Sequence, residues 1–383
     1  MIPLCEPKIQ GNEWKYVKDC LDSGWVSSVG EYVDKFEGSL ASYTGSQYAV
    51  ACVNGTSALH IALLIAGVGQ GDEVLLPALT FIAPANAIRY TGAWPVFIDV
   101  SFDIWQMDPQ KIKDFLTKEC TWRQGKLVNN KTGRIVRAIL PVHILGHPVD
   151  MDPILELAGK FGLEVIGDAT ESLGASYKGR KIGSLSGISA LSFNGNKIIT
   201  TGGGGMIITD NKEWAARARY LTTQAKDDSL EYIHNEIGYN YRLSNIQAAL
   251  GLAQMENIDS YIASKRNIAA HYREKLQNIP GISPMPFAVW AKPIFWLYTI
   301  LIDAAKFGIS SRDLLAKLRK DGIQSRPFWH PLCGLKPFKQ AYAYQIEVTD
   351  RLYRDGLSLP CSVGLKNEEQ DKVIETISRL KGE

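Results

Sequence analysis

The sequence predicts an α/β protein in which a large, mostly parallel sheet is followed by a smaller α+β domain. The first observation is a rhythm between about residues 49 and 210, where short apolar runs alternate with helical patterns. The second is that these runs are nearly continuous, which is typical of strands buried on both faces by helices. The third is length, because a chain of 383 residues is too long to fold around one small core and favours two domains.

The strands are expected in the order in which the apolar runs occur. AVACV is the first, and the stretch after it, TSALHIALLIAG, predicts a helix that ends at Gly67. EVLLPA and PVFIDV are the next two strands, around a helix near residues 82–91. The series continues with a helix from Asp152 to Lys160 and with four further apolar runs: RAILPVHIL, LEVIGDAT, ISALSF and GMIITD.

The pattern changes after Arg242. Residues 244–279 predict one long helix with Ser244 as its N-cap. Beyond it, WLYTILID predicts a strand, and SSRDLLAKLRKDG predicts a helix opened by a capping box of Ser310 and Asp313.

A final helix is expected over about residues 367–380. We therefore predict a large domain over residues 1–255, which includes an N-terminal segment that lines the substrate site. A small α+β domain is predicted over residues 256–383. A large α/β domain followed by a small one often leaves a cleft between them, where ligands bind.

Composition and charge limit the class of ligand. Lys+Arg 42 against Asp+Glu 40 gives a net charge of +2, so no basic field exists that would hold nucleic acid or an anionic membrane. No apolar run reaches the ~20 residues of a membrane helix, and the N-terminus lacks a signal-peptide pattern. The six cysteines are scattered without a C-x-x-C pair and the six histidines do not cluster. We expect reduced thiols, no metal site and a cytoplasmic protein.

Polar side chains follow several predicted strands at their carboxyl ends, where functional groups gather in open α/β sheets. Gly55, Thr56 and Ser57 begin a helix and offer N–H groups and hydroxyls to a phosphate, although plain helix capping explains this stretch more simply. Asp168 ends the run LEVIGD, and a buried carboxylate needs a partner. It either caps the next turn or holds the nitrogen of a heterocycle protonated.

Lys197 lies between ISALSF and four consecutive glycines. A phosphate-binding G-x-x-x-x-G-K-[ST] loop is excluded because Ile198 follows the lysine, and no G-x-G-x-x-G opens a helix after the first strand. A surface lysine in a hairpin is one explanation, but the loop has few other charges. The other is a lysine whose amine forms a covalent bond.

One ligand, pyridoxal 5′-phosphate, accounts for these stretches together. It needs a lysine that bonds to its aldehyde, an acid that keeps its ring nitrogen protonated and donors for its phosphate. Phe81, just after a predicted strand, is placed to stack on the ring.

The order of NGTSAL, TFIA, DATESLG, SFNGNK with TTGGGG, and GYNYRLSNIQAALG closely resembles the DegT/DnrJ/EryC1/StrS family of sugar aminotransferases over nearly the whole chain. The resemblance implies the aspartate aminotransferase fold (fold type I of the pyridoxal phosphate enzymes) and a homodimer with shared active sites. GNEWKYVKDCLDSGWVSSVG and GNKIITTGGGGM look most like enzymes that aminate UDP-linked 4-keto-6-deoxy-2-acetamido sugars, as in legionaminic acid and bacillosamine synthesis.

The resemblance also implies residue roles. Lys197 would bind the cofactor covalently, Asp168 would pair with its ring nitrogen and Phe81 would stack on it. Asn240 would reach the phosphate of the partner subunit's cofactor, and Glu171 stands where many members have Gln. The phosphate donors would lie at a helix start and a strand end: Gly55, Thr56, Ser57 and Ser192.

Substrate contacts are expected from the N-terminal segment, from a basic loop after Asp168 and from a Pro-flanked loop of the small domain. A solvated basic loop explains each of the basic candidates about as simply, and a packed or cleft-lining histidine is the alternative for His330. The candidates are Trp25, Ser27, Lys178, Arg180, Arg326 and His330, with Lys181 and Arg242 as further cations for a diphosphate.

These roles predict transfer of an amino group from L-glutamate to C4 of a nucleotide-linked 4-keto-6-deoxy sugar, with UDP-2-acetamido-2,6-dideoxy-hexos-4-ulose as the first candidate. Two alternatives are open. A keto-sugar 3-dehydratase of the same fold would have histidine in place of Lys197. A non-catalytic binding or regulatory protein on this scaffold would have lost Lys197 or Asp168.

Overall fold

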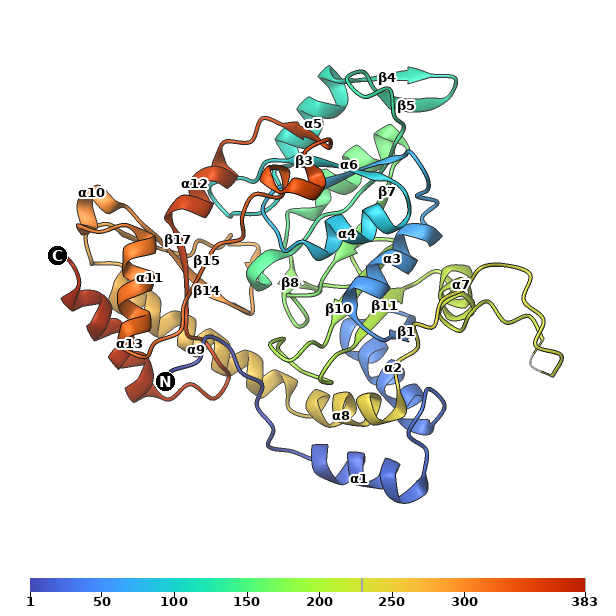
Figure 1. Cartoon of the computed structure of the whole chain (residues 1–383), viewed down its shortest axis with the longest axis horizontal. Helices are drawn as coiled ribbons and strands as arrows, with labels where there is room; N and C mark the ends of the chain where they lie inside the picture. The colour runs from blue at the N-terminus through green and yellow to red at the C-terminus, as the bar shows by residue number, and fades with distance from the viewer. Residues whose placement is uncertain (229, 383) are drawn as a thin grey trace.

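The computed structural model describes residues 1–228 and 230–382, and an eight-stranded sheet lies at its centre (Figure 1). The strand order is β1-β11-β10-β7-β6-β2-β3-β16. β11 runs antiparallel to both of its neighbours, and the other neighbouring pairs are parallel, so the predicted mostly parallel mixed sheet is confirmed. The strands are β1 (Tyr48–Cys52), β2 (Glu73–Pro77), β3 (Trp94–Ile98), β6 (Val136–Ile139), β7 (Glu164–Asp168), β10 (Ile188–Ser192), β11 (Gly205–Thr209) and β16 (Tyr342–Tyr344).

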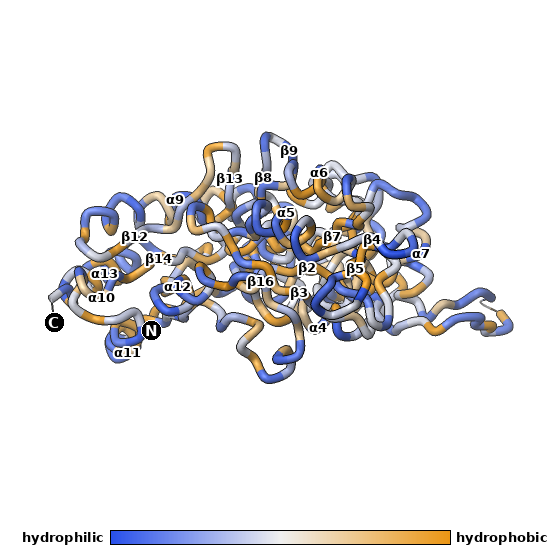
Figure 2. The backbone as a smooth tube through the Cα atoms, turned by 90° about the horizontal axis from the view of Figure 1, so that it is seen from above, coloured by the Kyte–Doolittle hydropathy of each residue, from blue (hydrophilic) through white to orange (hydrophobic). Residues whose placement is uncertain are grey.

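Helices cover both faces of this sheet. Seen from above, α4 and α6 lie on opposite sides of β2, β3 and β7, and the strands between them carry much of the apolar sequence (Figure 2). All five residues of β2 are buried, as expected for a strand covered on both faces. The helices around the sheet are α2 (Glu31–Thr44), α3 (Gly55–Ile65), α4 (Ala83–Tyr90), α5 (Pro109–Lys118), α6 (Met151–Phe161) and α7 (Lys212–Thr222).

A second, four-stranded antiparallel sheet belongs to the C-terminal part of the chain and has the order β12-β14-β17-β15. β16 comes from the same part but pairs with β3 of the large sheet, so this region contributes to both sheets. The elements are β12 (Ile282–Pro284), β14 (Tyr298–Ile302), β15 (Arg326–Pro327), β17 (Gly356–Leu359), α9 (Ile258–Leu276), α10 (Ala304–Phe307), α11 (Ser311–Lys320), α12 (Val348–Asp355) and α13 (Asn367–Arg379).

The remaining elements lie at the periphery, and the sequence analysis did not predict them. A small three-stranded sheet has the order β13-β8-β9, and a hairpin joins β4 to β5. Their bounds, with that of the first helix, are α1 (Glu13–Ser23), β4 (Cys120–Arg123), β5 (Lys126–Asn129), β8 (Ser176–Tyr177), β9 (Arg180–Lys181) and β13 (Ala291–Lys292). Within the described residues, no helix has both the length and the apolar character needed to cross a membrane.

The single long helix expected after Arg242 is wrong, because the chain forms α8 (Asn245–Met255) and then α9. Glu256 and Asn257 separate them, and Asn257 leaves the helical conformation with φ −111° and ψ 2°. Asparagine has a weak helix preference. The carboxylate of Glu256 also accepts hydrogen bonds from Tyr16 at 2.6 Å and Asn12 at 2.7 Å, which tie the break to α1.

Both predicted helix starts in this half of the chain are confirmed. Ser244 accepts from the backbone N–H of Gln247 while the Gln247 side chain accepts from the backbone N–H of Ser244. Ser310 and Asp313 form the same reciprocal arrangement at the start of α11. Each satisfies two N–H groups that a helix start otherwise leaves without partners.

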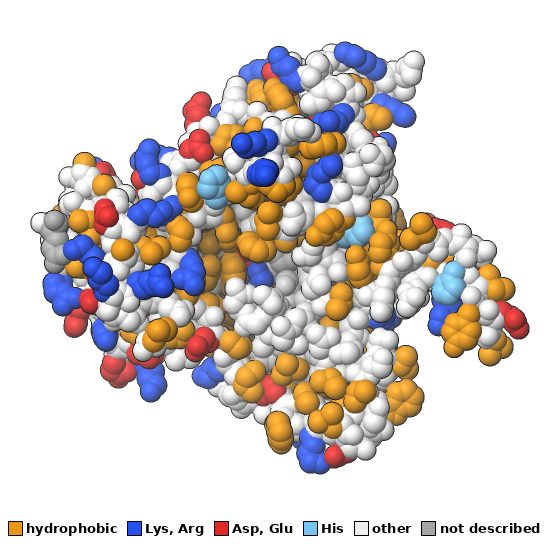
Figure 3. All heavy atoms as spheres, viewed as in Figure 1, with side chains coloured by type: hydrophobic (Ala, Val, Ile, Leu, Met, Phe, Trp, Pro, Cys, Tyr) orange, Lys and Arg blue, Asp and Glu red, His pale blue; other side chains and the backbone are white. Residues whose placement is uncertain are grey.

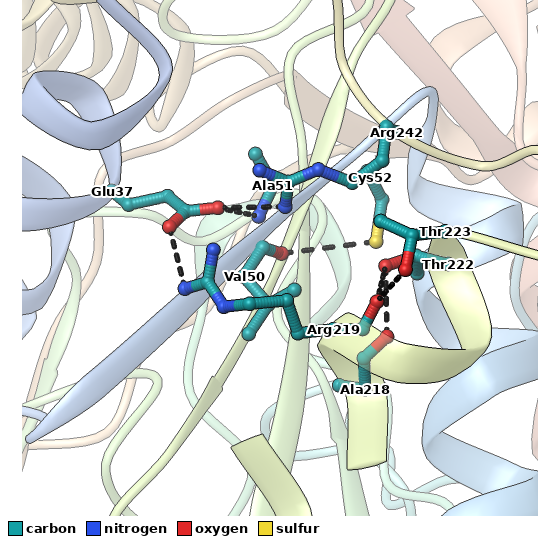
Figure 4. A network of polar contacts seen from close by, with 9 residues as sticks. All are labelled: Glu37, Val50, Ala51, Cys52, Ala218, Arg219, Thr222, Thr223 and Arg242. Atoms are coloured by element: carbon teal, nitrogen blue, oxygen red, sulfur yellow. Dashed lines mark hydrogen bonds and ion pairs between the residues drawn. The ribbon is translucent and has the colours of Figure 1, made fainter. Parts of the chain in front are cut away.

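A buried carboxylate joins α2, β1 and the chain after α7 (Figure 4). Glu37 is 6% exposed, and its Oε1 accepts from the backbone N–H of Ala51 at 2.8 Å and from Arg242 at 3.0 Å. Its Oε2 accepts from Arg219 at 2.7 Å. Arg242 is a candidate to bind the substrate diphosphate, but its guanidinium already pairs with a carboxylate of the same chain.

Glu37→Ala is expected to lower the free energy of unfolding by roughly 3–5 kcal/mol, because the charge of Arg242 and the N–H of Ala51 would lose their buried partner. Urea denaturation of both proteins measures the difference. The matched control is Glu236→Ala, which removes the exposed ion pair with Arg217 on α7 and should cost less than about 1 kcal/mol. Equal losses in the two variants would contradict the assignment.

Candidate active site

A cavity of about 890 Å³ opens where the carboxyl ends of β1, β7 and β10 face the second sheet. The space-filling view shows the surface hollowed between these two parts of the molecule (Figure 3). The cavity brings together most of the predicted cofactor residues and two of the predicted substrate residues. These are Gly55, Thr56, Phe81, Asp168, Glu171, Ser192, Lys197, Arg326 and His330.

Lys197 lies in the connection between β10 and β11, and its side chain is 12% exposed. Its Nζ is 3.7 Å from Oε1 of Glu171 and 4.0 Å from the centroid of the Trp296 ring. Trp296 is itself held, because its Nε1 donates to the carbonyl oxygen of Asn196 at 2.6 Å. The amine is thus placed between a carboxylate and an aromatic face, at the edge of an open cavity.

Glu171 is buried beside this amine. Its Oε2 accepts from the backbone N–H of Leu145 at 2.8 Å. Burial raises the pKa of Glu171 to about 7, while the charge of Lys197 and the Leu145 N–H act in the opposite direction. The carboxyl can therefore hold or release a proton near neutral pH, which the amide of a Gln at this position could not do.

The stability of the cofactor-free protein should depend on pH through Glu171. Its carboxyl has a pKa of 4.5 when unperturbed and about 7 in the fold, so the folded state keeps a proton that the unfolded chain releases. The free energy of unfolding therefore falls as the pH rises from 4.5 to about 7, the window between these two pKa values. We expect the stability advantage of Glu171→Gln over the wild type to grow across the window and level off above it. Urea denaturation of both apoproteins at several pH values tests this, and a pH-independent difference would refute it.

Asp168 ends β7 and is 2% exposed. Its Oδ1 accepts from the backbone N–H of Thr170 at 3.0 Å, so the carboxylate does cap the turn that follows. The same side chain lines the cavity, which leaves it available to a ligand. Burial raises the pKa of Asp168, and the hydrogen bonds from Thr170 and the charge of Lys197 oppose this rise.

The start of α3 provides donors of the kind that bind phosphate. The side chain of Asn54 accepts from the N–H of Ser57 at 2.8 Å, whereas the N–H groups of Gly55 and Thr56 have no intrahelical partner. A Cβ at Gly55 would lie 2.8 Å from Cβ of Ser192, so glycine lets the end of β10 approach this helix start. Free N–H groups and the hydroxyls of Thr56 and Ser192 suit a phosphate at a helix N-terminus.

The glycine run brings another backbone segment to the same place. Gly203 and Gly204 line the cavity, and a Cβ at Gly205 would come within 2.5 Å of the Asn54 backbone. Phe81 stands at the cavity wall with 54% of its surface exposed, as an aromatic ring available to a planar ligand. Lysine, acid, phosphate donors and aromatic ring together fit pyridoxal 5′-phosphate.

Three predicted cofactor and substrate residues do not line the Lys197 cavity. Ser57 is 7% exposed, and its N–H is already bound by Asn54. The carbonyl oxygens of Trp25 and Ser27 accept from Asn245 at 2.7 Å and 2.6 Å, which places both residues at the start of α8.

Three other predicted contacts lie away from the Lys197 cavity of the same chain. Lys178 and Arg180 both pair with Asp152, at 2.6 Å and 3.1 Å, beside the small sheet of β8, β9 and β13. Both cations share this one carboxylate partner, because the basic loop folds back onto α6. Asn240 lines a second cavity of about 500 Å³ near the start of α2 and forms a backbone bridge with Thr223.

Several wall residues of the Lys197 cavity were missed by the sequence analysis. Most come from segments far from Lys197 in sequence, where no local pattern marks a ligand contact, whereas Asn194 and Asn196 lie just before Lys197 and Trp329 lies in the predicted Pro-flanked loop. They are Pro3, Leu4, Cys5, Glu6, Leu145, Asn194, Asn196, Trp296, Gln324 and Trp329. Among the described residues, no group of three or more His, Cys, Asp or Glu side chains could hold a metal ion.

Comparison with known proteins places this site in a family. The sequence profile described as the DegT/DnrJ/EryC1/StrS aminotransferase family matches residues 7–378. A GDP-perosamine synthase of Caulobacter vibrioides is 40% identical over 382 residues, which cover 99% of this chain and 98% of that protein. A putative pyridoxal phosphate-dependent aminotransferase of Bacillus subtilis, EpsN, is 36% identical over 383 residues, 99% of this chain and 95% of that one.

Structural comparison agrees. The solved structure of S. venezuelae DesV superposes with a TM-score of 0.86 and 30% identity, covering 96% of this chain and 94% of that chain. The predicted subgroup of UDP-2-acetamido-sugar enzymes is not confirmed, because the relatives above do not carry that name. The predicted family, fold and cofactor are confirmed. The chain belongs to the DegT/DnrJ/EryC1/StrS aminotransferase family, and it is a pyridoxal phosphate-dependent aminotransferase.

Proposed function

We propose that the protein transfers an amino group from L-glutamate to C4 of a nucleotide-linked 4-keto-6-deoxy sugar. The observation that carries the proposal is the single cavity in which Lys197, Asp168 and the phosphate donors at the start of α3 meet. A relative named GDP-perosamine synthase supports an amino sugar attached to a nucleotide as the product.

The cofactor supplies a carbonyl group that receives the amine and a cationic ring that stabilises negative charge on the neighbouring carbon. Lys197 would bond covalently to the cofactor at this carbonyl carbon, and its Nζ, when free, would move the proton of the donor carbon. Glu171, with Oε1 at 3.7 Å, is placed to exchange a proton with Nζ. Asp168 keeps the ring nitrogen protonated through its buried negative charge.

The wall opposite Lys197 supports binding of an anionic substrate. Arg326 lines the cavity and donates to the carbonyl oxygen of Ser325 at 2.9 Å, and no carboxylate pairs with it among the described residues. Its guanidinium suits a diphosphate or the carboxylate of glutamate. His330 packs against Tyr353 with ring centroids 4.9 Å apart, which fixes the imidazole at the same wall.

Two nucleotides are candidates for the substrate. The N-terminal segment resembles enzymes of UDP-linked 2-acetamido sugars, whereas relatives at 40% identity are named GDP-perosamine synthases. The test incubates the holoenzyme with ¹⁵N-glutamate and either UDP-2-acetamido-2,6-dideoxy-hexos-4-ulose or GDP-4-keto-6-deoxy-mannose. We expect ¹⁵N at C4 of one product by mass spectrometry and NMR. Loss of the 3-hydroxyl would indicate the dehydratase, and no reaction with either sugar would refute the proposed substrate class.

We also propose that the active site is shared between two copies of the chain. Residues 225–228 and 230–239 form an arm after α7 that projects from the body in both views (Figures 1 and 2). Apolar side chains on this arm are strongly exposed: Leu230 86%, Tyr232 69% and Ile237 85%. Such a surface fits burial against a second copy. Asn240, at the base of the arm, would then reach the partner's cofactor phosphate.

Mixing two inactive variants tests the shared site. Lys197→Ala chains and Asn240→Asp chains should form heterodimers in which one of the two sites has both residues intact, so activity should return on mixing. The matched control mixes Lys197→Ala with Asp168→Asn, whose residues line one cavity of one chain and should not complement. If Asn240→Asp is inactive alone and heterodimers form without activity, Asn240 and Lys197 serve the same site of one chain and the proposal fails.

A further inference from the structure

A buried lysine without a carboxylate partner lies behind the active-site cavity. Lys265, on α9, is 1% exposed, and its Nζ donates to the carbonyl oxygens of Trp296 at 2.8 Å and Cys361 at 2.5 Å. The same Nζ is 3.5 Å from Sγ of Cys5 and 3.7 Å from Sγ of Cys361. Among the described residues no carboxylate forms an ion pair with it.

A buried ammonium without a negative partner is costly, and the acidic groups beside this one are thiols. The pKa of the Cys5 thiol is lowered to about 6, first by a hydrogen bond from the Cys361 thiol. Burial opposes this, and the charges of Lys265 and Lys197 lower the pKa further. The ammonium of Lys265, 3.5 Å from the Cys5 sulfur, therefore favours the thiolate form of Cys5, whose negative charge would balance that of Lys265.

The two sulfurs differ in access to small molecules. Cys5 lines the Lys197 cavity and is partly exposed, whereas Cys361 is 1% exposed. The backbone N–H of Cys361 donates to the carbonyl oxygen of Leu4 at 2.8 Å, so the cysteines stand on adjacent hydrogen-bonded segments. Such segments lie about 5 Å apart, a separation that a disulfide spans.

We propose that Cys5 is a modification site for hydroperoxides, and that Cys361 converts its oxidised form into a disulfide. The Cys5 thiolate attacks one peroxide oxygen, the O–O bond breaks, and the leaving oxygen departs as water after taking a proton from solvent. The Cys361 sulfur then attacks the Cys5 sulfenic acid, the S–O bond breaks, and the hydroxide takes the Cys361 proton and leaves as water. Two thiols lose two electrons, and one hydrogen peroxide becomes two waters.

The disulfide would change the active site in two ways. It removes a negative group that lies beside Lys265 and whose pKa is also lowered by the charge of Lys197. It also links the N-terminal segment, residues 3–6 of the cavity wall, covalently to the chain after β17. The rate of amino-group transfer is expected to fall when the disulfide forms and to recover when dithiothreitol reduces it.

The experiment treats the purified holoenzyme with hydrogen peroxide and maps its peptides by mass spectrometry, a readout that does not depend on the substrate. We expect a Cys5–Cys361 cross-linked peptide in the wild type. In Cys361→Ser, oxidation should stop at a Cys5 sulfenic acid that dimedone traps, and Cys5→Ser should give neither product.

Cys333 is the matched internal control, because it is also partly exposed but burial raises the pKa of its thiol. It should stay reduced at the peroxide concentration that oxidises Cys5. Oxidation of Cys333 before Cys5, or an unmodified Cys5 after the peroxide is consumed, would overturn the modification site. A complete disulfide with undiminished amino-group transfer would overturn its link to the active site.

Discussion

Lys197→Ala is expected to abolish turnover, the largest effect of any single substitution in this chain. The variant loses the amine that we propose bonds to the cofactor and moves the donor proton. Nζ stands 3.7 Å from Glu171 and 4.0 Å from the Trp296 ring centroid, and no other lysine lines the cavity to replace it in the described part of the chain. Steady-state formation of the amino sugar from glutamate measures the loss.

Lys126→Ala is the control for this substitution, because Lys126 is exposed on the β4–β5 hairpin and should be dispensable. The visible absorbance of bound cofactor provides a second readout, since the alanine variant cannot hold the cofactor covalently. Substantial steady-state activity in Lys197→Ala, with the variant correctly folded, would disprove the role of this lysine.

The sequence was sufficient for residues that follow strands of the central sheet. Asp168, Ser192 and the start of α3 each come directly after an apolar run, and parallel strands bring such positions to one edge. Lys197 could be singled out because Ile198 after it excludes the common phosphate-loop motif and no G-x-G-x-x-G opens a helix after the first strand. These inferences needed only local pattern and the general geometry of a parallel sheet.

Other features depended on contacts between distant segments. Cys5 comes from the N-terminal segment and Trp296 from the C-terminal part of the chain, and only tertiary packing places them beside Lys197. The basic loop of Lys178 and Arg180 suggested a diphosphate site, but Asp152 on a neighbouring helix pairs with both charges. The position of a lysine or arginine in the sequence shows neither which carboxylate pairs with it nor how far it lies from the active site.

The break between α8 and α9 has a similar cause. The hydrophobic pattern continues through residues 244–279, so periodicity alone favours one helix. The bonds from Glu256 to Tyr16 and Asn12 join residues about 240 positions apart, and no sequence window includes both sides.

Asp168→Asn is expected to slow amino-group transfer by a factor on the order of a hundred, which corresponds to ~3 kcal/mol for one electrostatic contact with developing charge. The amide oxygen can still accept from the N–H of Thr170, now 3.0 Å from Oδ1, so the turn after β7 should keep its shape. What is lost is the negative charge, and an amide cannot hold a ring nitrogen protonated by charge.

The rate of a single turnover with glutamate in the holoenzyme measures this loss separately from the rate of product release. Asp321→Asn is the control, because it removes one charge from an exposed ion pair with Arg379, away from the Lys197 cavity, and should leave the rate unchanged. Burial raises the pKa of Asp168, which means that its charge is costly in the empty fold. The asparagine variant should therefore be no less stable than the wild type without cofactor while being far slower with it. A variant that keeps the wild-type rate would show that the buried carboxylate does not serve the ring.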